Sequence, residues 1–93
     1  MLTTYRLGTI TYKIGMQLIC TSFRTEHGLK DHILEIASFD RNSKTHIWCH
    51  GISGLTYPDV DLIDLRLKYP EGNFGLTPKL ISNYAIYNNE WDI

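Results

Sequence analysis

Side chains with catalytic and metal-binding chemistry are most concentrated in the run His46-Ile47-Trp48-Cys49-His50. Zinc is bound by Cys and His ligands that converge in a tetrahedron, and a cysteine thiolate beside a histidine is the basis of nucleophilic cysteine catalysis. The run is typical of a strand, however, and neighbouring strand residues point to opposite faces. Cys49 therefore points away from both histidines, and we predict no metal ligand and no catalytic residue here. A small metal- or thiol-dependent enzyme is kept as an alternative function.

Other motifs that bind a cation, bind a phosphate or supply a nucleophile are incomplete. Asp59, Asp61 and Asp64 lack the central glycine and the later glutamate of a calcium loop. Residues 72–75, Gly-Asn-Phe-Gly, lack the Lys-Ser or Lys-Thr pair of a phosphate-binding loop, and the chain has no G-x-S-x-G nucleophile motif. We therefore predict a protein that is not an enzyme and that needs no cofactor.

The strand around Trp48 has one face suited to a core and one face that is not. Ile47 and Cys49 share the apolar face, which places His46, Trp48 and His50 on the other. A large aromatic side chain on that face needs a cover, which is a partner protein, a second copy in a homodimer, or a C-terminal helix. The sequence leaves open whether Trp48 belongs to the core or to an interface. We predict Trp48, His46 and His50 as partner-binding residues.

The first 25 residues contain no acid. They carry Arg6, Lys13 and Arg24, although the formal net charge of the whole chain is −1. Aromatic side chains beside basic ones form the surfaces that bind single-stranded nucleic acid. A nucleic-acid-binding module that uses this N-terminal hairpin is therefore a second alternative. Tyr5 and Arg6 are also predicted to contribute to the partner-binding surface.

Length and composition predict a single domain over residues 1–93. A chain with 43% hydrophobic and 20% charged residues is an ordinary globular one, not a disordered one. No apolar run approaches the ~20 residues of a membrane span, so we expect no membrane contact, and the first residues lack the apolar segment of a signal peptide. Cys20 and Cys49 are too few for a disulfide framework and predict free thiols in a reducing, cytoplasmic compartment.

Hydrophobic periodicity predicts an antiparallel β-meander of about five strands. Residues 9–24 fit a hairpin that reverses at Gly15, and residues 45–52 fit a strand rich in Thr, Ile and Trp. Residues 29–39 fit either a strand or a helix. The strand is favoured because their isoleucines and phenylalanine prefer β structure and polar breaks flank the segment.

The last third of the chain predicts one further strand and one helix. Residues 60–69 have the most regular alternation in the chain, which predicts a strand. Residues 78–88 fit a C-terminal helix, with Thr77 as its N-cap and Pro78 in the first helical position. The residues of the strand that are predicted to face the core are Ile63, Leu65 and Leu67.

These elements together predict an α+β fold, an antiparallel sheet with the C-terminal helix packed on one face. Because no catalytic set is complete, we predict a small non-enzymatic protein-binding module. Six tyrosines and two tryptophans supply more aromatic surface than one small core needs, and aromatic side chains are favoured at interfaces. A chain of this size that begins at Met1 also fits an inhibitor or immunity-type protein of a microbe or its phage.

Overall fold

Antiparallel sheet makes up most of the fold, and two short helices accompany it. The computed structural model describes residues 3–40, 45–55 and 61–87. This confirms the predicted antiparallel sheet, but in place of one long C-terminal helix there are two short helices, one of them at the start of the predicted helical segment. In chain order the elements are β1 Thr4–Leu7, β2 Ile10–Lys13, β3 Gln17–Cys20, β4 Arg24–Thr25, β5 Gly28–Phe39, β6 Ile47–Leu55, α1 Leu62–Lys68, β7 Phe74–Leu76, α2 Pro78–Ile81 and β8 Tyr84–Ile86.

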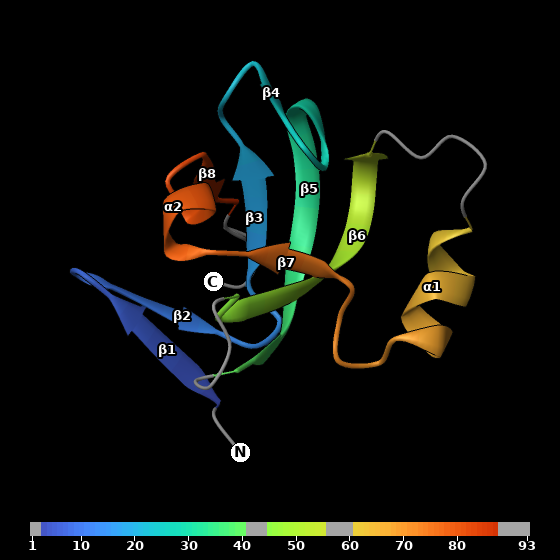
Figure 1. The fold of residues 1–93 in the computed structure, drawn as a ribbon, viewed down its shortest axis with the longest axis horizontal. Coiled ribbons are helices and arrows are strands. Elements are labelled where there is room, and N and C mark those ends of the chain that lie inside the picture. Colours follow the sequence, from blue (N-terminus) through green and yellow to red (C-terminus); the bar gives the residue numbers. More distant parts are fainter. Residues whose placement is uncertain (1–2, 41–44, 56–60, 88–93) are drawn as a thin grey trace.

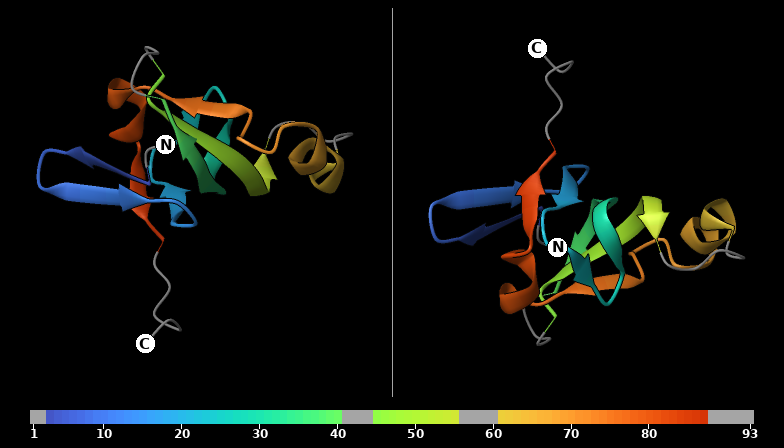
Figure 2. Two further views of the ribbon diagram at one scale, coloured as in Figure 1. Left: turned by 90° about the horizontal axis from the view of Figure 1, so that it is seen from below. Right: turned by 90° about the horizontal axis from the view of Figure 1, so that it is seen from above.

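The main sheet has the strand order β7-β6-β5-β3-β8, and the short β4 pairs with β5. All of these pairings are antiparallel. The sheet curls over itself, because β7 crosses in front of β3 and β5 in Figure 1 and lies in a separate layer from β3 in Figure 2. The helix α2 connects β7 and β8, the two ends of this order. Inside the curl lie the fully buried side chains of Leu18, Cys20, Leu34, Ile36, Ile47, Cys49 and Leu76.

A separate two-stranded hairpin, β1–β2, precedes the main sheet. Its turn lies at Gly8 and Thr9, because Leu7 pairs with Ile10 and Gly8 has a φ of +64° that suits glycine. The predicted hairpin over residues 9–24 is therefore wrong. β2 pairs with the preceding strand β1 and not with β3, and β3 pairs with β5 and β8.

The ambiguous segment 29–39 is a strand, so the helical alternative is wrong. It forms most of β5, the longest strand among the described residues, which pairs with β3 on one side and β6 on the other. These two ladders satisfy the backbone along the strand, and they place Leu34 and Ile36 in the core. The predicted strand at 45–52 is confirmed as β6, which begins at Ile47 and continues to Leu55.

The segment 60–69 contains a helix, and its predicted strand is wrong. Asp61 Oδ1 caps α1 by accepting hydrogen bonds from the backbone N–H groups of Ile63 at 2.9 Å and Asp64 at 3.3 Å. In this helix Ile63 and Leu67 lie one turn apart on the outer face, and their side chains are 72% and 75% exposed. The prediction that both face the core is therefore wrong.

The predicted helix over 78–88 is only one turn long. Thr77 does cap it, since its hydroxyl oxygen accepts from the Leu80 N–H at 3.2 Å, and Pro78 occupies the start of the helix as predicted. Residues 84–86 then leave the helical path and pair with β3 as β8. The backbone groups of β3 would otherwise form an open edge, and pairing with β8 satisfies them. Residue 88 lies outside the described residues.

Candidate functional site

Two surface grooves meet at Trp48, which is half-buried on β6. The first groove, of about 560 Å³, is lined by the turn after β2, the end of β5 and residues 70–72. The second groove, of about 530 Å³, lies between α1 and the start of β7. Trp48 and Gly72 line both grooves, so Trp48 is the one large side chain that the two linings have in common. Volumes of this size are in the range of ligand-binding clefts.

The segment between α1 and β7 forms a wall of both grooves and is fastened to the sheet. Ser38 on β5 donates a hydrogen bond from its hydroxyl to the Glu71 carbonyl at 2.6 Å. The Asn73 N–H donates to the Cys49 carbonyl at 3.0 Å. Gly72 has a φ of +96°, and a Cβ there would come within 2.8 Å of the Cys49 nitrogen. Only glycine lets the segment lie this close to β6. The segment is thus held to β5 through Ser38 and to β6 through Cys49.

A small residue on β7 makes space for the indole. Gly75 pairs with Trp48 across the β6–β7 ladder. A Cβ on Gly75 would lie 3.1 Å from the Cζ3 atom of the Trp48 ring. The indole is therefore packed along one edge by the β7 backbone, and the rest of the ring contributes to the grooves.

The other predicted site residues do not line either groove. His46 contacts Tyr5, with 2.7 Å between its Nδ1 atom and the Tyr5 hydroxyl, and the Tyr5 ring also stacks on Phe39. Arg6 donates from Nε to the Gly8 carbonyl within its own hairpin. The structure thus brings His46 and Tyr5 together but keeps both of them out of the Trp48 grooves.

His50 is buried, contrary to the prediction that it shares a partly exposed face with Trp48. Its Nε2 donates to the Tyr69 carbonyl at 2.9 Å, because the end of α1 lies over this part of β6. The ring therefore fastens α1 to the sheet. Arg66 on α1 adds a second link, an ion pair of 3.0 Å with Glu35 on β5.

The two tyrosines of the N-terminal hairpin pack toward the core. Tyr12 is buried, and Tyr5 stacks on Phe39. Their ring faces are thus committed to packing, which leaves Arg6 and Lys13 as the exposed charged side chains of the described hairpin. The β1–β2 hairpin itself therefore offers little of the aromatic stacking surface that single-stranded nucleic acid uses, whereas Phe23, later in the acid-free segment, is 87% exposed.

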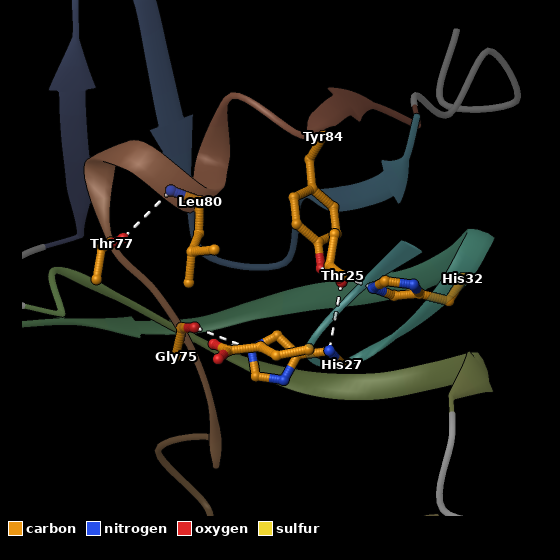
Figure 3. Close-up of polar contacts among 8 residues, drawn as sticks. Thr25, His27, His32, Gly75, Thr77, Leu80 and Tyr84 are labelled. Carbon is orange, nitrogen blue, oxygen red and sulfur yellow. Dashed lines mark hydrogen bonds and ion pairs between the residues drawn. The ribbon is translucent and has the colours of Figure 1, made fainter. Parts of the chain in front are cut away.

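The sequence pattern did not predict a buried polar network between His32 on β5 and Tyr84 on β8. Figure 3 shows His32 pointing from β5 toward Tyr84 on β8, and the His32 Nε2 atom lies 2.6 Å from the Tyr84 hydroxyl. The other ring nitrogen, Nδ1, donates to the Leu29 carbonyl at 2.7 Å. The carbonyl can only accept, so Nε2 of the neutral ring accepts from the Tyr84 hydroxyl. His32 continues the buried alternation of Leu34 and Ile36, which is the sequence signal that points to it.

The surroundings of His32 and Tyr84 disfavour charge on either ring. Burial lowers the pKa of His32 below its ordinary value, and burial raises the pKa of Tyr84 to about 12. A second histidine, His27, contacts β7. Its Nε2 atom lies 3.1 Å from the Gly75 carbonyl oxygen. Because a carbonyl only accepts, Nε2 of His27 is the donor, and this contact joins the β4–β5 turn to β7 (Figure 3).

Cys49 lacks the environment of a nucleophile. It is fully buried, and burial followed by the charge of Glu35 raises the pKa of its thiol. Cys20 is also fully buried, and both cysteines are free. Within residues 3–40, 45–55 and 61–87, no three His, Cys, Asp or Glu side chains are grouped closely enough to hold a metal ion.

The state of the two cysteines gives a direct test of this burial. We expect the folded protein to react slowly with a thiol-specific reagent and the denatured, unreduced protein to release two thiols. Thiol titration with and without guanidinium measures both. Rapid labelling of the folded protein, or an intact mass lower by about two hydrogens, would contradict the buried free thiols.

Comparison with known proteins finds no matching family model, no matching curated protein and no matching solved structure. Among the helices of the described residues, none is both long and apolar enough to cross a membrane. The arrangement of side chains around Trp48 therefore carries the functional interpretation.

Proposed function

We propose that this chain is a small non-enzymatic protein-binding module and that its binding surface comprises the two Trp48 grooves and the outer face of α1. The observation that carries the proposal is the exposure of Ile63 and Leu67 on the outer face of α1, the helix whose Leu65 lines the second groove with Trp48. Exposed apolar side chains and aromatic grooves are both typical of protein interfaces. An inhibitor or immunity-type protein binds its target through such a surface, and that role is a prediction within this class.

The position of α1 is fixed by contacts within this chain. The cap at Asp61, the ion pair between Arg66 and Glu35 and the hydrogen bond from His50 to Tyr69 all hold α1 in place. None of them involves the side chain of Ile63 or Leu67. Those two side chains can therefore be changed while the contacts that fix the helix are kept.

We expect the double substitution Ile63→Glu with Leu67→Glu to abolish partner binding and to leave the fold intact, because both side chains are largely exposed. The tagged wild-type protein is used to capture its partner from the native host, with identification by mass spectrometry. The variant is then compared with wild type for binding of that purified partner. Loss of interface anchors should weaken binding by at least ~30-fold, or about 2 kcal/mol.

Phe23→Glu is the matched control. Phe23 is 87% exposed, but it lies before β4, lines neither groove and is not part of α1. The control should bind as wild type does. Equal binding by wild type and the Ile63/Leu67 variant would refute this surface, and a nucleic acid that co-purifies in place of a protein would favour the nucleic-acid alternative.

A further inference from the structure

The main sheet ends in two outer strands, and their free edges differ. β7 lies at one end of the strand order and β8 at the other. On β7 the Gly75 carbonyl accepts a hydrogen bond from the Nε2 atom of His27 (Figure 3). Among the described strands, β8 pairs with β3 alone. The side of β8 that points away from β3 is therefore an open sheet edge.

The hydrogen bonds at the two ends of the β3–β8 ladder fix which residues of β8 face β3. The Thr21 N–H donates to the Asn83 carbonyl, and the Tyr87 N–H donates to the Gln17 carbonyl, both at 2.8 Å. Hydrogen-bonded and non-hydrogen-bonded pairs alternate along an antiparallel ladder. The backbone groups of Asn83, Ala85 and Tyr87 that take part in this ladder therefore face β3.

The residues between them direct their backbone groups to the open edge. Tyr84 and Ile86 occupy the non-hydrogen-bonded positions of the ladder, so the N–H and the C=O of both residues point away from β3. These groups are two donors and two acceptors on one straight strand. A further β-strand is the natural partner for such a row of groups.

The edge of β8 is complementary to a second copy of itself in the antiparallel direction. A two-fold axis beside Ala85 would place Tyr84 of one copy opposite Ile86 of the other, and the reverse. Residues opposite each other in a hydrogen-bonded pair exchange both N–H···O bonds, so this register satisfies every outward group of both strands. Ala85 would then face Ala85 of the other copy in a non-hydrogen-bonded pair, where the strands are closest and a small side chain fits.

β8 also lacks the features that keep edge strands from pairing. Protected edges carry charged side chains, proline or a bulge. Residues 84–87, Tyr-Ala-Ile-Tyr, contain neither a charge nor a proline, and the register with β3 runs without a shift. The side chain of Ala85 is exposed, and that of Ile86 is 38% exposed. Isoleucine and tyrosine are also among the residues that favour strand pairing.

We propose that this chain forms a homodimer by antiparallel pairing of β8 with β8 of a second copy, which joins the two main sheets into one. The side chain of Ile86 lies on the same face of β8 as that of Tyr84, so it packs beside Tyr84 of the other copy. No residue of β8 lines either Trp48 groove, so this interface does not rest on the proposed function. A strand of three residues makes a small interface, and association is therefore weak and dependent on concentration.

Two measurements on the wild-type protein test the pairing. In sedimentation equilibrium, we expect the mass to rise from one chain toward two between about 10 µM and about 1 mM. In amide hydrogen exchange over the same range, the Tyr84 and Ile86 amides should become protected as the concentration rises. The Ala85 amide, which faces Ile19 on β3, should be protected throughout.

Ile86→Pro blocks the edge and keeps the ladder with β3. Proline removes the N–H of Ile86, which points outward, and proline is tolerated on an edge strand where the missing N–H faces solvent. We expect dimerisation to weaken by at least ~10-fold. Ile86→Val is the matched control, because it keeps the N–H and a β-branched side chain, and it should dimerise as wild type does.

A charge pair at Ala85 tests the position of the two-fold axis. Ala85→Lys and Ala85→Glu each place like charges opposite each other in the dimer, so each variant alone should be monomeric. An equimolar mixture of the two should associate at least as well as wild type, because opposite charges then face each other. Ala85 is exposed, so both variants should fold, and circular dichroism melts of all variants verify this.

The outcomes separate the dimer from the proposed partner interface. Wild type that stays monomeric at about 1 mM, or dimers that persist in Ile86→Pro and in both single Ala85 variants, would overturn the proposal. Dimerisation lost in the Ile63/Leu67 variant but kept in Ile86→Pro would overturn it as well. A captured protein that still binds Ile86→Pro would keep the proposed function in each of these cases.

Discussion

Replacing His32 by alanine is expected to lower the free energy of unfolding by about 2–5 kcal/mol. The side chain is fully buried and packs against the backbone at Gly28 and Gly54, where a Cβ would come within 3 Å of it. Its removal leaves a cavity and deprives the Leu29 carbonyl of its donor and the Tyr84 hydroxyl of its acceptor. Urea denaturation of wild type and variant measures the loss.

Tyr84→Phe is the matched variant for this network. It keeps the ring that packs on His32 and removes the hydroxyl that donates to the His32 Nε2 atom. We expect a smaller loss of about 1–3 kcal/mol, since one buried acceptor is left unpaired without a large cavity. An unchanged stability in His32→Ala would mean that the ring is not held between β5 and β8 in solution.

The same histidine gives the stability a defined dependence on pH. Its pKa in the folded protein is lowered by burial, so below its ordinary value of about 6.5 the unfolded chain binds more protons than the folded one. Stability is therefore fully present above that value and is lost as the pH falls toward the lowered pKa. Melting temperatures at pH 7 and pH 5 should differ more for wild type than for His32→Gln. Equal differences would show that another group dominates.

The strands that cross the core were predictable because their pattern is simple. Leu34 and Ile36 on β5, and Ile47 and Cys49 on β6, alternate with less buried neighbours, and Ile36 pairs with Cys49 across the sheet. Period-two alternation reports burial on one face directly. The same rule, applied one step further back along β5, indicates His32 as a core residue.

The error at residues 60–69 has a different cause. Alternating apolar residues predict a strand only if the apolar ones are buried, and here Ile63 and Leu67 are exposed. The cap at Asp61 and the good helix propensity of leucine, arginine and lysine decide the local structure. The C-terminal helix was overestimated for the opposite reason, because pairing of Tyr84 with Cys20 on β3 outweighs the local helical pattern.

The candidate site was predictable only at its centre. The sequence indicates Trp48 as an aromatic side chain on the less apolar face of a strand, and the structure finds it half-buried between two grooves. The groove walls depend on a contact between Ser38 and Glu71, which are 33 positions apart, and on the close approach of Gly72 to Cys49. Such long-range contacts have no periodic signature in one sequence.

Leu34 and Leu67 offer the sharpest comparison between the strand at the centre of the sheet and the helix at its side. Leu34 is fully buried on β5, where it pairs with Leu18 on β3 and with Gly51 on β6. Leu34→Ala removes side-chain atoms from a site that its neighbours on both sides enclose, and we expect a loss of about 2–5 kcal/mol in the free energy of unfolding.

Leu67→Ala makes the same chemical change at a position that is 75% exposed on α1. Alanine is at least as good a helix former as leucine, so the free energy of unfolding should stay within about 0.5 kcal/mol of wild type. Urea melts of the two variants, with equal slopes against denaturant, measure this difference. A loss in Leu67→Ala as large as that in Leu34→Ala would return Leu67 to the core, where a strand over residues 60–69 would place it, and would remove the exposed apolar face on which the proposed interface depends.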